Sequence, residues 1–232
     1  MNVFRFQQFD IKQDSEVFRV GTDAVLLGVL ADLEHAKNVL EIGTGTGVIA
    51  MMLAQRFPQT NILGVDVNRI AVGLASSNFK ASPFANRLTA ELKDIKTFDS
   101  EMKFDAIFSN PPYFQVNSSS KDVVARQKIE LDFKTLIQSS SKLLNDSGKL
   151  IVIIPRQDEE VFISLCEKEN LFLQRNVSIR GIVGGEVRRS VLEFSKLKAD
   201  RIIKEEFVIE KSPRQYSDQY LELTKDFHLF KS

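Results

Sequence analysis

The sequence contains no tryptophan, only one cysteine and only two histidines. Cys166 cannot form an internal disulfide, and one cysteine with two histidines is too few for a Cys/His zinc site, so we expect no metal. The 31 basic and 31 acidic residues cancel. Any contact with nucleic acid must therefore use local patches rather than overall charge. We expect Cys166 to be a small core residue.

Long apolar runs are also missing. None approaches the roughly 18 residues of a membrane span, and the start, MNVFRFQQFDIK, mixes charges and amides into its apolar positions, unlike a signal peptide. Hydrophobic residues make up 43% and charged residues 27% of the 232 residues, which is ordinary globular usage. We expect a cytoplasmic monomer with a single domain over residues 1–232.

Residues 1–36 precede the regular part of the pattern. FRFQQFDI begins like a strand, and VFRV is predicted to return as its hairpin partner. In TDAVLLGVLADL the apolar residues Leu26, Val29, Leu30 and Leu33 recur at helical spacing. This predicts a short amphipathic helix, which Thr22 is able to cap.

Strands and helices alternate through the core, residues 37–197. The predicted strands are NVLEI, NILGVDV, RLTAELKD, FDAIFSN and KLIVIIP. The helices between them include GVIAMMLAQRF and RIAVGLASSNFKAS, and the helix EEVFISLCEKEN follows the last strand. Apolar strands separated by helices indicate an α/β fold, a doubly wound parallel sheet with helices on both faces. From residue 171 an antiparallel hairpin with a turn at Gly184 and Gly185 closes the sheet, and residues 198–232 add a short strand and a helix.

Three glycines follow the first core strand. In VLEIGTGTGVIA, Gly43, Gly45 and Gly47 precede a helix, where they allow close approach of a ligand to the backbone and to the helix N-terminus. A dinucleotide fingerprint requires glycine at position 48, which is Val48. The spacing therefore argues against a dehydrogenase.

Acidic residues mark the ends of three neighbouring strands. Asp66 follows Gly43 by 23 residues, where a carboxylate accepts both ribose hydroxyls of a nucleoside, and Asp94 ends the third strand, within reach of an adenine amine. Glu41 lies inside a buried strand, where an unpaired charge is costly. Asp94 capping a turn and Glu41 pairing with a lysine are the alternatives. Together the acids and glycines favour a cationic nucleoside ligand, and S-adenosylmethionine fits.

The segment FSNPPYF ends the fourth strand with a stiff loop. The Asn110 side-chain oxygen and the Pro111 carbonyl can accept hydrogen bonds from an exocyclic amine and favour a pyramidal, nucleophilic nitrogen. Pro112 adds stiffness, and Tyr113 can stack on the base. The alternative is a rigid turn without a substrate.

Several motifs resemble those of known proteins. EIGTGTG, GVDV, LKD and SNPPYF resemble class I methyltransferases that act on amines, and FRVGTDAVLLG resembles the N-terminal motif of the tRNA1(Val) adenine-N6 methyltransferase family. The resemblance implies a Rossmann-like fold with a mostly parallel seven-stranded sheet and S-adenosylmethionine-dependent N6-methylation of an adenine in the tRNA anticodon loop. It implies a catalytic tetrad of Asn110, Pro111, Pro112 and Tyr113. The cofactor-binding set that we predict is Thr22, Asp23, Glu41, Gly43, Thr44, Gly45, Gly47, Asp66, Val67, Asp94, Ile95 and Asn110.

The tetrad alone leaves other substrates open. Related enzymes use it on glutamine amides of release factors, on guanine in ribosomal RNA and on adenine in DNA, and a nucleotide-binding module without catalysis is a further alternative. The N-terminal motif and the short tail favour tRNA. The predicted substrate contacts are Tyr113, Phe114, Arg126, Arg188 and Arg189.

Further cations are candidates for phosphate contacts, although each is also readable as an ordinary solvated charge. These are Arg5, Lys12, Arg19, Lys121, Lys128 and Arg180. The polar loop predicted for residues 115–128 either closes over the base or is a linker.

Overall fold

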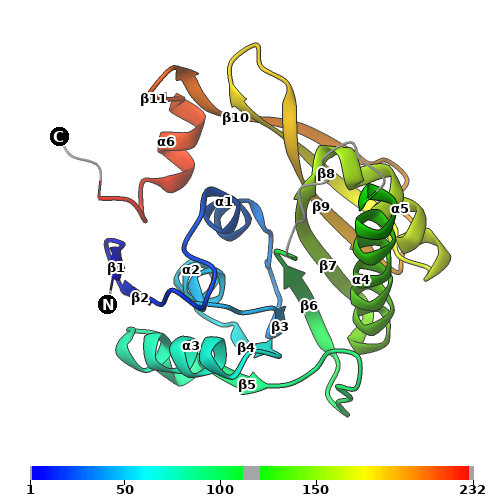
Figure 1. The fold of residues 1–232 in the computed structure, drawn as a ribbon, viewed down its shortest axis with the longest axis horizontal. Coiled ribbons are helices and arrows are strands. Elements are labelled where there is room, and N and C mark those ends of the chain that lie inside the picture. The colour runs from blue at the N-terminus through cyan, green and yellow to red at the C-terminus, as the bar shows by residue number, and fades with distance from the viewer. Residues whose placement is uncertain (1, 112–120, 230–232) are drawn as a thin grey trace.

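The computed structural model describes residues 2–111 and 121–229, apart from the side chains of residues 121–131. The described residues form a nine-stranded sheet in the order β11-β10-β8-β9-β7-β6-β3-β4-β5 and a separate hairpin of β1 and β2 (Figure 1). The strands are β1 (Asn2–Arg5), β2 (Asp10–Gln13), β3 (Asn38–Ile42), β4 (Asn61–Asp66), β5 (Leu88–Leu92), β6 (Phe104–Ser109), β7 (Leu144–Pro155), β8 (Phe172–Ile182), β9 (Val187–Ser195), β10 (Ile203–Ser212) and β11 (Gln215–Tyr216). The α-helices are α1 (Thr22–Leu30), α2 (Val48–Arg56), α3 (Arg69–Ala81), α4 (Lys121–Leu143), α5 (Glu159–Lys168) and α6 (Asp218–Thr224).

The sheet is buried on both faces because side chains of β7 alternate between two apolar clusters. Ile151 and Ile153 pack with residues of α1 and α2, whereas Val152 and Ile154 pack with residues of α4 and α5. Figure 1 shows α1, α2 and α3 on one side of the sheet and α4 and α5 on the other. Strands β3 to β7 pair in parallel. The predicted α/β fold is confirmed, and Cys166 is buried as predicted.

The hairpin and the far end of the sheet differ in part from the prediction. Strands β8 and β9 form the predicted antiparallel hairpin. The sheet is two strands wider than seven because β10 pairs in parallel with β8, and β11 pairs with β10. Helix α4 begins at Lys121, so residues 121–128 are helical rather than part of a loop as predicted. No helix among the described residues is long and apolar enough to cross a membrane.

The N-terminal segment folds around Val17. Strand β1 pairs with β2, with Asn2 opposite Gln13, so the prediction that residues 17–20 form the returning strand is wrong. Val17 is instead buried with Ala71 and Leu74 of α3. The backbone amide of Val20 donates to the Gln13 side-chain oxygen at 2.9 Å, which ties the end of this loop to β2.

Helix α1 is buried all round rather than amphipathic, since every residue from Ala24 to Leu30 is buried. It lies against both α2 and β7, and a helix enclosed in this way needs apolar residues on every side. Its N-cap is Gly21, and no side chain caps it. The predicted cap, Thr22, is the exposed first residue of the helix.

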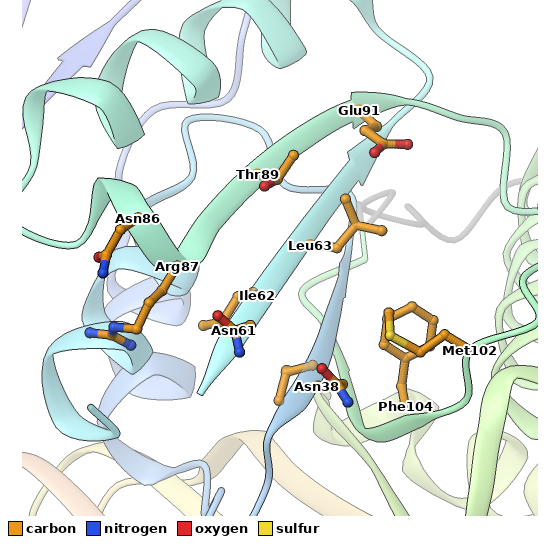
Figure 2. Close-up of a pocket in the computed structure, with 11 residues that line it drawn as sticks. Asn38, Asn61, Ile62, Leu63, Asn86, Arg87, Thr89, Glu91, Met102 and Phe104 are labelled. Atoms are coloured by element: carbon orange, nitrogen blue, oxygen red, sulfur yellow. The ribbon is translucent and has the colours of Figure 1, made fainter. Parts of the chain in front are cut away.

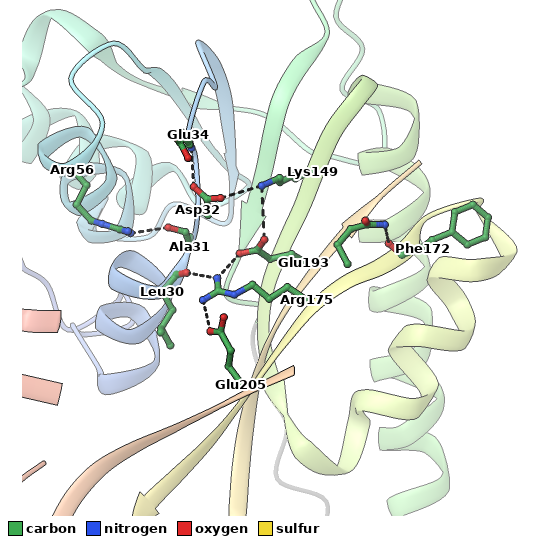
Figure 3. Close-up of polar contacts among 11 residues, drawn as sticks. Leu30, Ala31, Asp32, Glu34, Arg56, Lys149, Phe172, Arg175, Glu193 and Glu205 are labelled. Carbon is green, nitrogen blue, oxygen red and sulfur yellow. Dashed lines mark hydrogen bonds and ion pairs between the residues drawn. The ribbon is translucent and has the colours of Figure 1, made fainter. Parts of the chain in front are cut away.

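A cluster of charged residues fixes the C-terminal end of α1 to the sheet (Figure 3). Arg175 of β8 donates to the Leu30 carbonyl and to the carboxylates of Glu193 and Glu205, each at 2.8 Å. Glu193 is buried, and removing the partner of a buried carboxylate is strongly destabilising. This anchor leaves the N-terminal end of α1 facing the opposite edge of the sheet.

Candidate active site at the carboxyl edge of the sheet

The carboxyl ends of four neighbouring parallel strands meet at one edge of the sheet. Ile42 of β3 pairs with Ser109 of β6, and Asp66 of β4 pairs with Leu92 of β5. The Ser109 hydroxyl also donates to the Ile42 carbonyl at 2.8 Å. Ligands of open α/β sheets bind at this edge. The predicted site segments that lie along it are residues 43–47, 66–67, 93–95 and 110–111.

The glycine loop has a backbone that only glycine adopts easily. Gly43, Gly45 and Gly47 have φ values of 78°, 53° and 79°, in the left-handed region. A Cβ on Gly43 would meet no atom within 4 Å, whereas a Cβ on Gly47 would collide with the ring of Phe79. Gly43 therefore borders open space suitable for a ligand, and Gly47 is required by packing.

Glu41 is a buried carboxyl at the base of this loop. Its side chain is 1% exposed, the Thr44 hydroxyl donates to Oε2 at 2.6 Å, and Oε1 has no hydrogen-bond partner among the described residues. Burial raises the pKa of Glu41 to about 8, and the nearby Asp66 contributes to the rise. The alternative of a lysine partner does not hold, because no ion pair involves Glu41 among the described residues. An unpartnered buried oxygen is a position where a ligand cation would be stabilised.

Asp66 holds the loop as well as facing the edge. Its Oδ2 accepts from the Gly45 amide at 3.0 Å and its Oδ1 accepts from the Asn68 amide at 2.9 Å. The following residue, Val67, has 68% of its surface exposed. An exposed valine at this edge offers an apolar face to a planar ligand group.

Asp94 lies two residues beyond the end of β5 rather than at its end as predicted. Its Oδ1 accepts from the Lys96 amide at 2.9 Å, so it caps a turn, as in the alternative that we considered. The Asp94 carboxylate is exposed and Ile95 is half-buried. The proposed contacts of Asp94 and Ile95 with a ligand stay predictions.

Asn110 and Pro111 follow β6 and are both half-buried. The remaining tetrad residues, Pro112 and Tyr113, lie outside the described residues, as does Phe114. Asn110 directly follows Ser109, which pairs with Ile42. The asparagine therefore stands one strand away from the start of the glycine loop.

The structure brings Asp23 and Arg189 together. Arg189 of β9 lies opposite Pro155 at the carboxyl end of β7, and its Nε donates to Asp23 Oδ2 of α1 at 2.9 Å. One was predicted to contact the cofactor and the other the RNA. Their ion pair fixes the N-terminal turn of α1, including Thr22, at the site edge.

The predicted phosphate contacts separate into paired and unpaired cations. Arg180 forms an ion pair with Glu206 at 3.2 Å. Arg188 is exposed, and neither a hydrogen bond nor an ion pair occupies its guanidinium among the described residues. The structure does not describe the side chains of Lys121, Arg126 and Lys128. Arg188 is therefore the hairpin cation that is open to a phosphate.

Two residues that support the glycine loop were not predicted from the sequence. Gly64, opposite Glu41 in β4, lacks a Cβ that would overlap the Thr44 hydroxyl, and so allows Thr44 to reach Glu41. Asn78 is buried in α3 and donates to the Thr46 carbonyl at 2.9 Å, which clamps the glycine loop. The signal for Gly64 was a glycine inside a strand, which often marks close approach of another group.

A hollow of about 200 Å³ lies elsewhere, mainly near the amino ends of β3, β4 and β6 (Figure 2). Figure 2 shows Asn38, Asn61 and Phe104 around it. Residues 93–103, which connect β5 to β6, contain no helix, so this part of the sheet face is thinly covered. No group of three or more His, Cys, Asp or Glu residues that could hold a metal occurs within the described ranges.

Residues 10–167 match the methyltransferase small domain family. The fold is similar to a predicted O-methyltransferase from Agrobacterium tumefaciens, with a TM-score of 0.68 and 17% identity over 88% of this chain and 96% of that one. A methyltransferase from Pyrococcus furiosus has a TM-score of 0.62 and 21% identity over 81% of this chain and 89% of that one. The fold and the family match define a class I methyltransferase.

Proteins with similar sequences identify the family within this class. A protein of Flavobacteriaceae bacterium strain 3519-10, named tRNA1(Val) (adenine(37)-N6)-methyltransferase, is 51% identical over 99% of this chain and 100% of its own length. A protein of the same name from Phocaeicola vulgatus is 41% identical over 97% of each chain. The chain belongs to the tRNA1(Val) (adenine(37)-N6)-methyltransferase family, which confirms the predicted resemblance.

Proposed function

We propose that this protein methylates N6 of adenine 37 in tRNA1(Val), with S-adenosylmethionine as the cofactor. The observation that carries the proposal is similarity over the whole chain, at 51% identity, to a relative named for this reaction. The protein works as a monomer in the cytoplasm, where it meets its tRNA. Release-factor glutamine, ribosomal guanine and DNA adenine are the alternative substrates, and none has a comparable observation in its favour.

The residues at the carboxyl edge fit this cofactor. Glu41 offers a buried, unpartnered oxygen for a cationic group, and Gly43 leaves open space beside the loop. Asp66 provides a carboxylate for ribose hydroxyls, while Val67 and Ile95 provide apolar surface for a base. When bound, S-adenosylmethionine supplies a methyl group activated by a sulfonium.

Asn110 and Pro111 prepare the target amine. A purine amine is a poor nucleophile because its lone pair is delocalised into the ring. Hydrogen bonds from the amine to the Asn110 side-chain oxygen and the Pro111 carbonyl favour a pyramidal nitrogen. The strand end and the fixed φ of Pro111 hold both acceptors still, which lowers the entropic cost of reaching a reactive geometry. Tyr113 stacks on the extruded base.

The test is methyl transfer from labelled cofactor to a tRNA1(Val) transcript, followed by nucleoside analysis. We expect N6-methyladenosine with wild-type protein and none with a transcript that carries guanine at position 37. A release factor supplied in place of tRNA tests the glutamine alternative, and labelling of that protein instead of tRNA would refute the proposal.

Asn110→Ala tests the proposed chemistry. We expect a loss of turnover of at least about 100-fold, typical of removing a transition-state hydrogen bond, with cofactor affinity nearly unchanged. The matched control, Asn86→Ala, changes an exposed asparagine at the opposite edge of the sheet and should retain full activity. Substantial activity of Asn110→Ala would remove Asn110 from the mechanism.

A further inference from the structure

Phe18 is the most exposed large hydrophobic residue in the described part of the chain, with 84% of its surface accessible. None of the other described phenylalanines is in the exposed class. Leaving an aromatic ring in water forgoes the stabilisation that burial would provide. Burial in the core therefore does not account for this ring, and its surroundings decide whether it has a role.

The loop that carries Phe18 is held firmly on both sides of it. Val17 is only 7% exposed and packs on α3, and the Val20 amide donates to Gln13 at 2.9 Å. The Glu16 amide donates to Asp14 Oδ1 at 2.9 Å. The ring of Phe18 is therefore presented to solvent by an anchored backbone.

This loop lies over the candidate active site. A Cβ on Gly45 would stand 3.9 Å from Val17 Cγ1, and the Gly45 amide itself donates to Asp66. Three residues after Phe18, Gly21 is the N-cap of α1, whose Asp23 is paired with Arg189 at the site edge. Phe18 thus projects from a segment that lies beside the glycine loop.

Arg19 adds charge beside the ring. It is exposed, and its guanidinium is without a hydrogen bond or ion pair in the described part of the structure. An aromatic ring next to an unpaired cation suits single-stranded RNA, because bases stack on the ring and the phosphate between them pairs with the cation.

We infer that Phe18 is a stacking platform for an unpaired anticodon-loop base of the tRNA, with Arg19 pairing to an adjacent phosphate. The inference rests on the proposed function and adds a substrate-positioning residue to it. The stacked base is a base next to the target adenine or the target itself. The cofactor is not part of this contact.

The experiment compares tRNA1(Val) binding by Phe18→Ala, Phe18→Trp and wild-type protein, using fluorescence anisotropy at fixed salt. Stacking of one base on an aromatic ring corresponds to roughly 5- to 150-fold in affinity. We expect Phe18→Ala to weaken binding and raise KM for tRNA by a factor in this range, and Phe18→Trp to restore both. The matched control is Leu197→Ala, which removes a 62% exposed side chain beyond β9 at the opposite edge.

Calorimetry with S-adenosylhomocysteine provides the second arm. Cofactor affinity of Phe18→Ala within about twofold of wild type supports an RNA contact. An equal loss of cofactor affinity would show that the ring stacks on the cofactor's adenine and would overturn the inference. Unchanged tRNA affinity would also overturn it, and wild-type methylation of the same tRNA would then leave the proposed function standing.

Discussion

Replacing Glu41 with glutamine should make the cofactor-free protein more stable than wild type. The difference in the free energy of unfolding should grow as the pH rises. Glutamine has the shape of a protonated glutamate and can accept the same hydrogen bond from Thr44, which is 2.6 Å from the carboxyl oxygen. Burial raises the pKa of Glu41 from 4.5 to about 8. The folded state therefore holds a proton that the unfolded state releases over this range.

The sign and size of the effect follow from proton linkage. Stabilisation by protonated Glu41 is complete below pH 4.5 and is lost as the pH rises through about 8. Within this window the free energy of unfolding falls by about 1.4 kcal/mol per pH unit for one group. Between pH 5.5 and 7.5 the wild-type protein should lose about 2–3 kcal/mol relative to Glu41→Gln.

Urea unfolding of both proteins at these two pH values measures the difference. Glu101→Gln, which alters an exposed carboxyl, serves as a control and should follow the wild-type pH dependence. Parallel pH dependence of wild type and Glu41→Gln would refute the reasoning. With cofactor present the order should reverse, since glutamine cannot supply a negative charge to a buried cation.

Two further paired comparisons test the loop and the RNA surface. Gly47→Ala should lower the free energy of unfolding in urea by about 2–5 kcal/mol, because it adds left-handed backbone strain and overlap with Phe79. Gly43→Ala should cost only the backbone strain, and its main effect should be weaker cofactor binding in calorimetry. If both variants lose the same stability, the distinction between packing and ligand space is wrong. Arg188→Ala should weaken tRNA binding and reduce the log–log salt slope by about 1, whereas the exposed Arg201, beyond β9 at the opposite edge, should tolerate alanine without change. Equal behaviour of these two variants in a salt titration would exclude Arg188 as a phosphate contact.

The core of the fold could be predicted from local pattern because both periodicity and burial act on short segments. NVLEI coincides with β3, and the alternation of Ile151 and Val152 between two apolar clusters is what a doubly covered strand requires. The N-terminal segment was harder. The apolar residues of VFRV suggested a strand, but Val17 is buried against α3, which no local pattern encodes.

The site was predictable where a residue type is unusual for its position. A glutamate in an apolar strand and three glycines after it are unusual, and these four residues lie at the carboxyl edge of the sheet, as predicted. Pairings between distant segments could not be predicted from local pattern. The contact of Asp23 with Arg189 joins positions 166 residues apart, and each side chain alone is readable as a ligand contact.

The two chain ends support the site together. Gln7, in the turn of the N-terminal hairpin, donates to the carbonyls of Lys225 and His228, and the ring of Phe6 lies 6.4 Å from that of Phe227. The same hairpin supplies Gln13, which holds the loop of Phe18 in place beside Gly45. The C-terminal segment thus steadies the hairpin, and the hairpin steadies the loop at the mouth of the site. Residues far from the candidate site therefore contribute by fixing the surface that we propose as the RNA contact.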